Sequence, residues 1–231
     1  MEKNYYTIGN TPAVVYGGVS DKAFLFVHGL CGSKADAERF AQTAVPLGYQ
    51  VLAIDLPEHG GRTDGAKLLP WEVLPELKGV LSHAKDKWQD ISVYAISIGA
   101  WFSLLSFAGE NIKRCLLVSP LLDMENMISN MMRQAGVTEQ QLKAAGEIPC
   151  ADGQTLSWKY LCWARENPVN ALCENTSILY ATGDELIPRS VIDSFTERTH
   201  SRLTLLEGGH HRIHTEEEVA FLSQWERQNL A

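Results

Sequence analysis

The chain has 231 residues, and 28 acidic side chains against 20 lysines and arginines give it a formal net charge of −8. With 45% apolar and 21% charged residues the composition is that of an ordinary globular protein, which excludes a disordered or collagen-like chain. The negative net charge disfavours binding to nucleic acid or to an anionic membrane, since both partners require a clustered basic surface.

Apolar runs alternate with helical patterns along the first half of the chain. Strands are expected at 5–8, 13–16, 23–27, 51–56, 91–96 and 115–118, the first two as an antiparallel hairpin. Helices are expected at 33–47, 71–88 and 98–108, with Ser33 as an N-cap and Pro75 in a first turn or at a break.

The alternation stops between 121 and 175 and then resumes. A strand is expected at 178–182, a helix at 189–199, a strand at 203–206 and a final helix at 215–229. Strands that alternate with helices predict an α/β protein with a mostly parallel, doubly wound sheet. We expect this core to be formed by 1–120 and 176–231, with 121–175 as an inserted helical cap after the sixth strand, without strands of its own.

Two features bear on location. The charge-free run 91–109 has 19 residues, the length of a membrane span, but its serines, its glycines and its change of pattern favour a strand, a sharp turn and a buried helix. The five cysteines are odd in number and form no CxxC pair, which predicts free thiols rather than disulfides or a zinc knuckle. Without a signal-peptide pattern at the N-terminus, a reducing cytoplasmic location is expected.

Three of the predicted strands are followed by residues that could carry chemistry. Ser97 lies between a strand and a helix, with the small Ala95 and Gly99 two positions to either side, as a tight turn requires. The helix behind Ser97 would direct backbone N–H groups toward an oxyanion. The structural alternative is that Ser97 only caps this helix.

The other two reactive positions come late in the chain. Asp184 follows strand 178–182, and the pair His210 and His211 follows strand 203–206. Asp184 could instead cap the helix that starts near 188, and Asp123 is an alternative acid. The chain order is therefore serine, acid, histidine, each in a loop after a strand.

With this order the sequence resembles the α/β-hydrolase family, whose nucleophile occupies such a turn. Three segments are similar to motifs of the family: Phe26–Leu30 to the His-Gly oxyanion loop, Asp55–Gly60 to the Asp-x-Pro-Gly-His-Gly loop, and Gly208–His214 to the Gly-Gly-Asp-His-Arg-Phe ending of small esterases. The resemblance covers 23–120 and 176–229, but not the expected cap.

The resemblance implies Ser97 as nucleophile, His211 as base, Asp184 as orienting acid, and the N–H groups of Leu30 and Ile98 as oxyanion donors. The longer motif register selects His211, and a shorter Gly-Gly-His register would select His210.

Four positions depart from the family pattern. Ala95 and Glu58 replace glycines, Ala181 stands where many members have glycine, and the serine expected after the His-Gly loop is missing near Gly61. These departures weaken the assignment to a subfamily more than the assignment to the fold.

The implied activity is cleavage of a small-molecule acyl ester, as in carboxylesterases. A thioesterase, amidase or acyltransferase on the same residues is an alternative, and so is a catalytically silent ligand-binding protein. The expected cap would supply an apolar or aromatic acyl pocket. No cofactor is implied, and no metal is expected, because no carboxylate or cysteine lies at a ligand spacing from His210, His211 and His214. His28 and His59 are expected to fix loops by hydrogen bonds.

Overall fold

The computed structural model describes residues 1–150 and 153–230. The chain forms two compact units, one from Met1–Leu121 with Asn170–Ala231 and one from Leu122–Val169. Residues 151–152 of the expected cap and residue 231 of the expected core lie outside the described part.

The first unit is built on an eight-stranded sheet in the order β1-β2-β4-β3-β5-β6-β9-β10. β2 pairs antiparallel with β1 and β4, and every other pair of neighbours is parallel, which confirms the predicted mostly parallel sheet. The strands are β1 (Lys3–Ile8), β2 (Thr11–Tyr16), β3 (Lys22–Val27), β4 (Gln50–Ile54), β5 (Asp90–Ile96), β6 (Cys115–Val118), β9 (Thr176–Ala181) and β10 (Arg202–Leu206).

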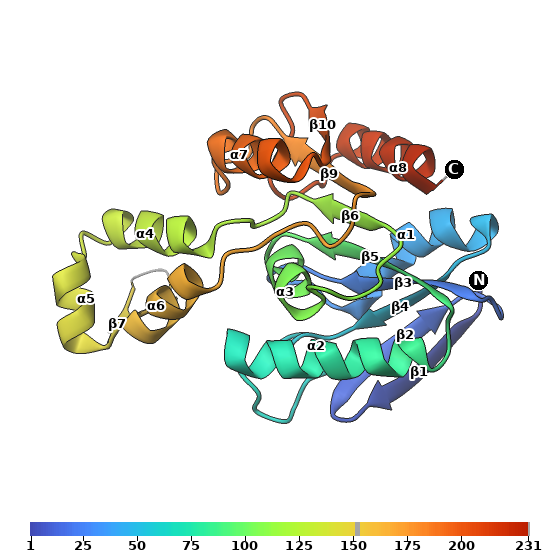
Figure 1. Cartoon of the computed structure of the whole chain (residues 1–231), viewed down its shortest axis with the longest axis horizontal. Coiled ribbons are helices and arrows are strands. Elements are labelled where there is room, and N and C mark those ends of the chain that lie inside the picture. The colour runs from blue at the N-terminus through green and yellow to red at the C-terminus, as the bar shows by residue number, and fades with distance from the viewer. Residues whose placement is uncertain (151–152, 231) are drawn as a thin grey trace. The chain divides into compact units, whose positions relative to one another are not determined.

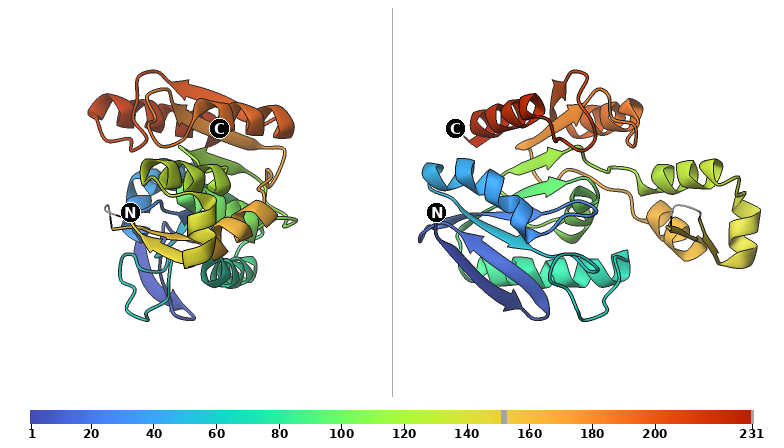
Figure 2. Two further views of the ribbon diagram at one scale, coloured as in Figure 1. Left: turned by 90° about the vertical axis from the view of Figure 1, so that its left-hand side faces the viewer. Right: turned by 180° about the vertical axis from the view of Figure 1, so that it is seen from behind.

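Helices cover both faces of this sheet (Figure 1). α1 (Ala37–Ala44) and α8 (Glu216–Leu230) pack together on one face, and Figure 2 shows them side by side in the view from behind. α2 (Pro70–Lys85) and α3 (Ile98–Ser106) pack together on the other face. α7 (Arg189–Thr199) connects the parallel strands β9 and β10. The sheet is therefore doubly wound, as predicted.

The central strands are almost continuously apolar because helices cover them on both sides. Every residue of Ala23–Val27 is at most 1% exposed. Between β3, β5 and α1, the rings of Phe26, Phe40 and Tyr94 form a cluster, with the centroids of Phe40 and Tyr94 4.1 Å apart. This packing fixes the carboxyl ends of the central strands, where Ser97 lies.

Two helices differ from their predicted form. The helix expected at 33–47 is three pieces, the 3₁₀ turn η1 (Lys34–Asp36), α1, and the 3₁₀ turn η2 (Val45–Leu47), although Ser33 does cap the first one in a capping box. Pro75 lies in the body of α2, and the proline at the start of that helix is Pro70, where a missing N–H costs nothing.

The second unit contains the helices α4 (Met124–Gln134), α5 (Glu139–Ala145) and α6 (Trp158–Glu166). Arg165 of α6 forms ion pairs with Glu125 of α4 and Glu139 of α5. The unit also has an antiparallel hairpin of β7 (Glu147–Pro149) with β8 (Thr155–Ser157), so the prediction that 121–175 has no strand was wrong. Strands of three residues are too short to show the alternation by which strands are predicted.

The charge-free run 91–109 is divided between β5 and α3, as expected. In the part of the chain that the structure describes, no helix combines the length and the apolar character that crossing a membrane requires.

Candidate active site

Ser97 stands at the sharp turn between β5 and α3, in a backbone conformation that side chains rarely adopt. Its φ is 50° and its ψ is −122°, and its side chain makes no hydrogen bond that caps α3. The turn is held by the bond from the Ser97 N–H to the Val118 carbonyl and by the bond from the Leu121 N–H to the Ser97 carbonyl, each 3.1 Å long. Such strain costs on the order of 1–3 kcal/mol and persists only where the surrounding structure enforces it.

Gly99 explains why this turn requires a small residue two positions after the serine. A Cβ at Gly99 would lie 2.3 Å from the carbonyl oxygen of His28 and 2.6 Å from that of Val27. Both oxygens belong to backbone, that of the last residue of β3 and that of the residue after it, so they cannot move aside as a side chain could. The first turn of α3 is thus pressed against the end of β3, which brings the loop after β3 next to Ser97.

The Ser97 side chain contacts the first of the two candidate bases, His211. The Ser97 Oγ lies 2.9 Å from Nε2 of His211, and Nδ1 of the same ring lies 2.7 Å from Oδ2 of Asp184. Because a carboxylate can only accept, Nδ1 carries the proton and Nε2 offers its lone pair to the serine hydroxyl. The Asp184 side chain is fully buried and that of His211 is 17% exposed.

The Asp184 carboxylate has a second task, but this task is not the capping of α7, because the N-cap of α7 is Pro188 and no side chain of the described residues caps that helix. Its Oδ1 accepts the N–H groups of Leu186 and Ile187, each at 2.9 Å, and so shapes the turn that precedes α7. Its Oδ2 remains for His211. The alternative that Asp184 caps the helix was therefore wrong: Oδ1 stabilises the turn before α7, and Oδ2 bonds to His211.

The loops that carry Asp184 and His211 touch through their glycines. The Gly183 N–H donates to the Gly209 carbonyl at 3.0 Å, and a Cβ at Gly183 would lie 2.7 Å from that same oxygen. Only a residue without a side chain permits this approach. The contact sets the spacing between the acid and the histidine.

The loop after β3 passes directly beside the serine. A Cβ at Gly29 would lie 3.2 Å from the Ser97 Cβ, so the backbone of Gly29 borders the serine side chain, and Leu30 is the next residue of the same loop. Ile98 is the first residue of α3, where N–H groups lack partners within the helix. Among the described residues, no backbone acceptor takes the N–H of Leu30 or of Ile98. Both remain available as donors.

Two histidines hold this loop, as the sequence led us to expect. In His28, Nε2 accepts the Leu56 N–H at 3.0 Å and Nδ1 donates to the Gly29 carbonyl at 2.7 Å. In His59, Nε2 accepts the Cys31 N–H at 3.1 Å and Nδ1 donates to the Pro57 carbonyl at 2.8 Å. Burial lowers the pKa of His28, and the neutral ring that results is the form that can both accept and donate.

Asp55 is a buried carboxylate at the end of β4 that serves the same loops. It accepts the Lys34 and Gly61 N–H groups at 2.7 and 2.8 Å and pairs with the Lys34 ammonium at 2.5 Å. Burial alone would raise the pKa of Asp55, but the hydrogen bonds from Lys34 and Gly61 outweigh it and lower the pKa. The resemblance to an Asp-x-Pro loop therefore reflects loop structure rather than chemistry.

The alternative candidates lie elsewhere. The His210 ring contacts Glu218 and makes no contact with Ser97, because Nδ1 of His210 lies 2.7 Å from Oε1 of Glu218. Asp123 caps α4 in the second unit by accepting the Asn126 N–H at 2.8 Å. The structure thus brings together Ser97, His211 and Asp184.

Sequence reasoning missed Glu218. Its carboxylate contacts both His210 and His214, so the expectation that no carboxylate accompanies these histidines was wrong. Thr215 and Glu218 form a capping box at the start of α8, a Thr-x-x-Glu pattern that is visible in the sequence. The pattern predicts the cap but not the contact with the two rings.

No protein-family model matches the chain, and no curated protein matches it in sequence. Solved structures do match it in fold. A putative hydrolase from Agrobacterium vitis S4 has a TM-score of 0.78 at 17% identity, over 100% of this chain and 99% of the other. Est1E from Butyrivibrio proteoclasticus, solved with ferulic acid bound, has a TM-score of 0.74 at 19% identity, over 97% and 96%. α/β-Hydrolase domain-containing protein 10 from mouse has a TM-score of 0.74 at 14% identity, over 97% of this chain and 96% of the other.

Proposed function

Since the chain has the α/β-hydrolase fold, we propose that it is a serine hydrolase that cleaves carboxylic esters through an acyl-enzyme on Ser97. The observation that carries the proposal is the continuous line of hydrogen bonds from Ser97 through His211 to Asp184. Nucleophile, base and orienting acid within hydrogen-bond reach of one another are the arrangement by which such residues are recognised.

In the acylation step, the Ser97 Oγ attacks the carbonyl carbon of the ester while its proton moves to Nε2 of His211. A serine hydroxyl is a weak nucleophile, so removal of this proton during the attack is what makes the step feasible. Collapse of the tetrahedral intermediate breaks the bond to the alcohol. His211 returns the proton to the departing alkoxide, and the acyl group stays on Ser97.

Two groups of contacts support the charges that develop. Asp184 holds the His211 ring with Nδ1 protonated and stabilises the imidazolium that forms when Nε2 accepts the proton. The N–H groups of Leu30 and Ile98 would bind the oxyanion, a contribution of about 3–4 kcal/mol for each such donor. Both donors belong to backbone that is fixed before substrate binds, by Gly99 against the end of β3 and by the bonds of His28 and His59.

In the deacylation step, water gives its proton to Nε2 of His211 and attacks the acyl carbon. The acid is released, and the proton returns to Ser97. Thioesters and amides can follow the same sequence of steps, and the proposal selects esters as the commonest substrates of this arrangement. Est1E holds ferulic acid, an aromatic carboxylic acid, and on that analogy aromatic acyl esters belong in the first substrate panel.

We assign two further features on the same basis. The segment 121–175 leaves the core after β6, whose carboxyl end pairs with the end of β5 next to Ser97, and we propose that it serves as a cap. The five cysteines are all free thiols, which supports a reducing compartment such as the cytoplasm.

A fluorophosphonate probe, which phosphonylates activated serines, tests the proposal. We expect the wild-type protein to be labelled, Ser97→Ala to remain unlabelled, and Ser103→Ala to be labelled as the wild type is. Ser103 is the matched control because it is buried in α3 and its Oγ has no hydrogen-bond partner among the residues that the structure describes. A folded wild-type protein that takes up no probe would favour the alternative, a silent ligand-binding protein.

A further inference from the structure

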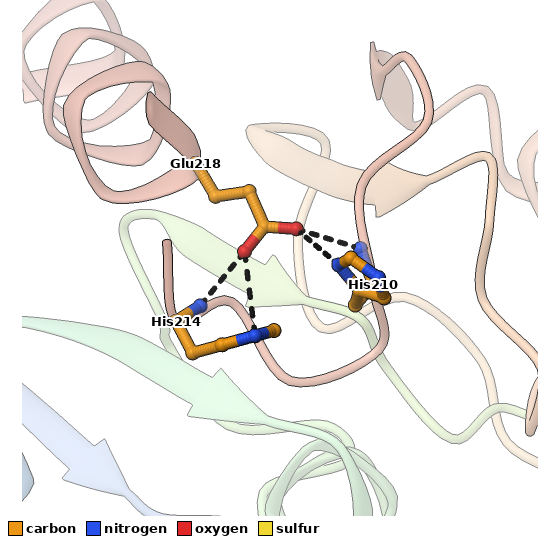
Figure 3. Close-up of side chains that lie close together, drawn as sticks. All are labelled: His210, His214 and Glu218. Atoms are coloured by element: carbon orange, nitrogen blue, oxygen red, sulfur yellow. Dashed lines mark hydrogen bonds and ion pairs between the residues drawn. The ribbon is translucent and has the colours of Figure 1, made fainter. Parts of the chain in front are cut away.

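The loop that follows β10 folds back onto a single carboxylate, that of Glu218 (Figure 3). The Glu218 side chain is 8% exposed and accepts the backbone N–H groups of His210, His214 and Thr215, each at 2.9 Å. Three backbone N–H donors directed at one carboxylate favour an anionic acceptor. The loop thus encloses a fixed negative charge.

Two exposed imidazoles lie against the same carboxylate. Nδ1 of His210 is 2.7 Å from Oε1, and Nδ1 of His214 is 3.5 Å from Oε2 (Figure 3). The His210 and His214 rings are 59% and 57% exposed, so solutes can reach both. The function proposed above uses neither ring.

The three side chains also have the spacing of metal ligands. One donor atom from each lies within 4.8 Å of the others, and the centroids of the two rings are 5.1 Å apart. Two imidazoles that bind one zinc ion at about 2.0–2.1 Å and a tetrahedral angle have ring centroids roughly 5 Å apart. The two rings already stand at this separation.

We propose that His210, His214 and Glu218 form a binding site for a divalent transition metal. Two imidazoles and one carboxylate are a donor set typical of Zn²⁺, with water in the fourth position. The metal takes the place of the proton between His210 Nδ1 and Glu218 Oε1, while the backbone N–H groups of 210, 214 and 215 continue to orient the carboxylate from behind. Each ring would bind the ion through Nδ1 as a neutral imidazole, so the proton that Nδ1 now donates, to Glu218 from His210 and to the Arg212 carbonyl from His214, would move to Nε2 of the same ring by exchange with solvent.

This site does not depend on the function proposed above, because none of its ligands is Ser97, Asp184 or His211. Its position nonetheless places His211 between the two ligating histidines in the chain. A bound ion would cross-link the loop on both sides of His211.

The test is a Zn²⁺ titration of the untagged, chelator-stripped full chain in competition with a chromogenic chelator. We expect one Zn²⁺ per chain for the wild type, and an affinity at least about tenfold weaker for His210→Ala and for His214→Ala. Both variants keep the backbone N–H groups that hold Glu218, so the loop remains folded. His200→Asn is the matched control, since His200 is exposed and has a φ of 56° that Asn tolerates, and its affinity should equal that of the wild type.

A second test measures thermal stability and, like the titration, is independent of enzyme activity. Saturating Zn²⁺ should raise the Tm of the wild type by several degrees and leave that of His214→Ala unchanged, because a ligand stabilises only the state that binds it. Absence of stoichiometric binding to the wild type, or undiminished affinity in both histidine variants, would overturn the metal site. Because the fluorophosphonate result is independent of Zn²⁺ binding, failure of one proposal is distinguishable from failure of the other.

Discussion

Gly99 offers the sharpest test of how the serine turn is built. In Gly99→Ala the new Cβ would lie 2.3 and 2.6 Å from the backbone oxygens of His28 and Val27, well inside van der Waals contact. Overpacking at such a site costs typically about 1–3 kcal/mol. We expect the upper part of this range, because backbone atoms of a buried strand end cannot relax as a side chain does. For a domain of this size that loss corresponds to a fall in Tm of roughly 4–12 °C.

The same substitution at Gly79 is the matched control, and it should change the Tm in the opposite direction. Gly79 is exposed in the body of α2, and a Cβ there would meet no atom of the described residues within 4 Å. Replacing a helical glycine by alanine stabilises a helix by roughly 0.5–1 kcal/mol. Gly79→Ala should therefore raise the Tm slightly and leave ester turnover unchanged.

Activity separates a local effect from a global one. To accommodate the methyl group of Gly99→Ala, the start of α3 must move away from the loop after β3, which separates the N–H groups of Ile98 and Leu30. Since one oxyanion donor contributes about 3–4 kcal/mol, we expect kcat to fall by roughly 10²-fold or more in protein that is still folded. The assays are thermal unfolding and the hydrolysis of p-nitrophenyl acetate. A Gly99→Ala protein with wild-type Tm and wild-type kcat would refute the close-approach reasoning.

Three further predictions concern individual side chains. Asp184→Asn should lower kcat by roughly 10³–10⁴-fold with little change in KM, since an amide N–H₂ facing Nδ1 imposes the wrong tautomer on His211; steady-state kinetics with near-wild-type kcat would contradict this. Ser97→Gly should be more stable to urea than Ser97→Ala by about 1 kcal/mol, because glycine adopts a φ of 50° without strain; equal midpoints would argue against strain at the turn. Burial lowers the pKa of His28 below its ordinary 6.5, so as the pH falls the unfolded chain takes up a proton before the folded chain does. The contribution of His28 to the free energy of unfolding is therefore complete above pH 6.5 and is lost as the pH falls, by no more than about 1.4 kcal/mol per pH unit. Urea unfolding between about pH 7.5 and 5.5 should show a smaller loss for His28→Gln than for the wild type.

The sheet and the serine turn were predictable because their signals are local. A buried strand needs a continuous apolar run, and a tight strand-to-helix turn needs small neighbours, and Ala95 and Gly99 satisfy the second condition. The motif register favoured His211 and kept His210 as the alternative, because no local pattern separates adjacent loop residues that differ only in the direction of their side chains. In the structure that direction follows from long-range contacts, those of Gly183 with Gly209 and of Glu218 with the His210 N–H.

Features in which one segment folds back against another were not predictable from local sequence patterns. The hairpin of β7 and β8 pairs strands of three residues, too short for a pattern. The contact of Glu218 with both histidine rings requires the loop after β10 to curl back onto the first turn of α8, which no spacing rule anticipates. By contrast, the division of 33–47 follows partly from Pro46 at the start of η2.

Trapping of the acyl-enzyme tests the central claim most directly. On mixing with p-nitrophenyl acetate and rapid acid quench, mass spectrometry should find one acetyl group per chain, located on Ser97, and the release of p-nitrophenol should show a burst of matching size if deacylation is slower than acylation. His211→Ala should abolish this adduct, whereas His210→Ala should retain it, because the His211 ring contacts the Ser97 Oγ and the His210 ring contacts Glu218 instead. Acetylation at a residue other than Ser97, or an adduct that survives in His211→Ala and disappears in His210→Ala, would contradict the account.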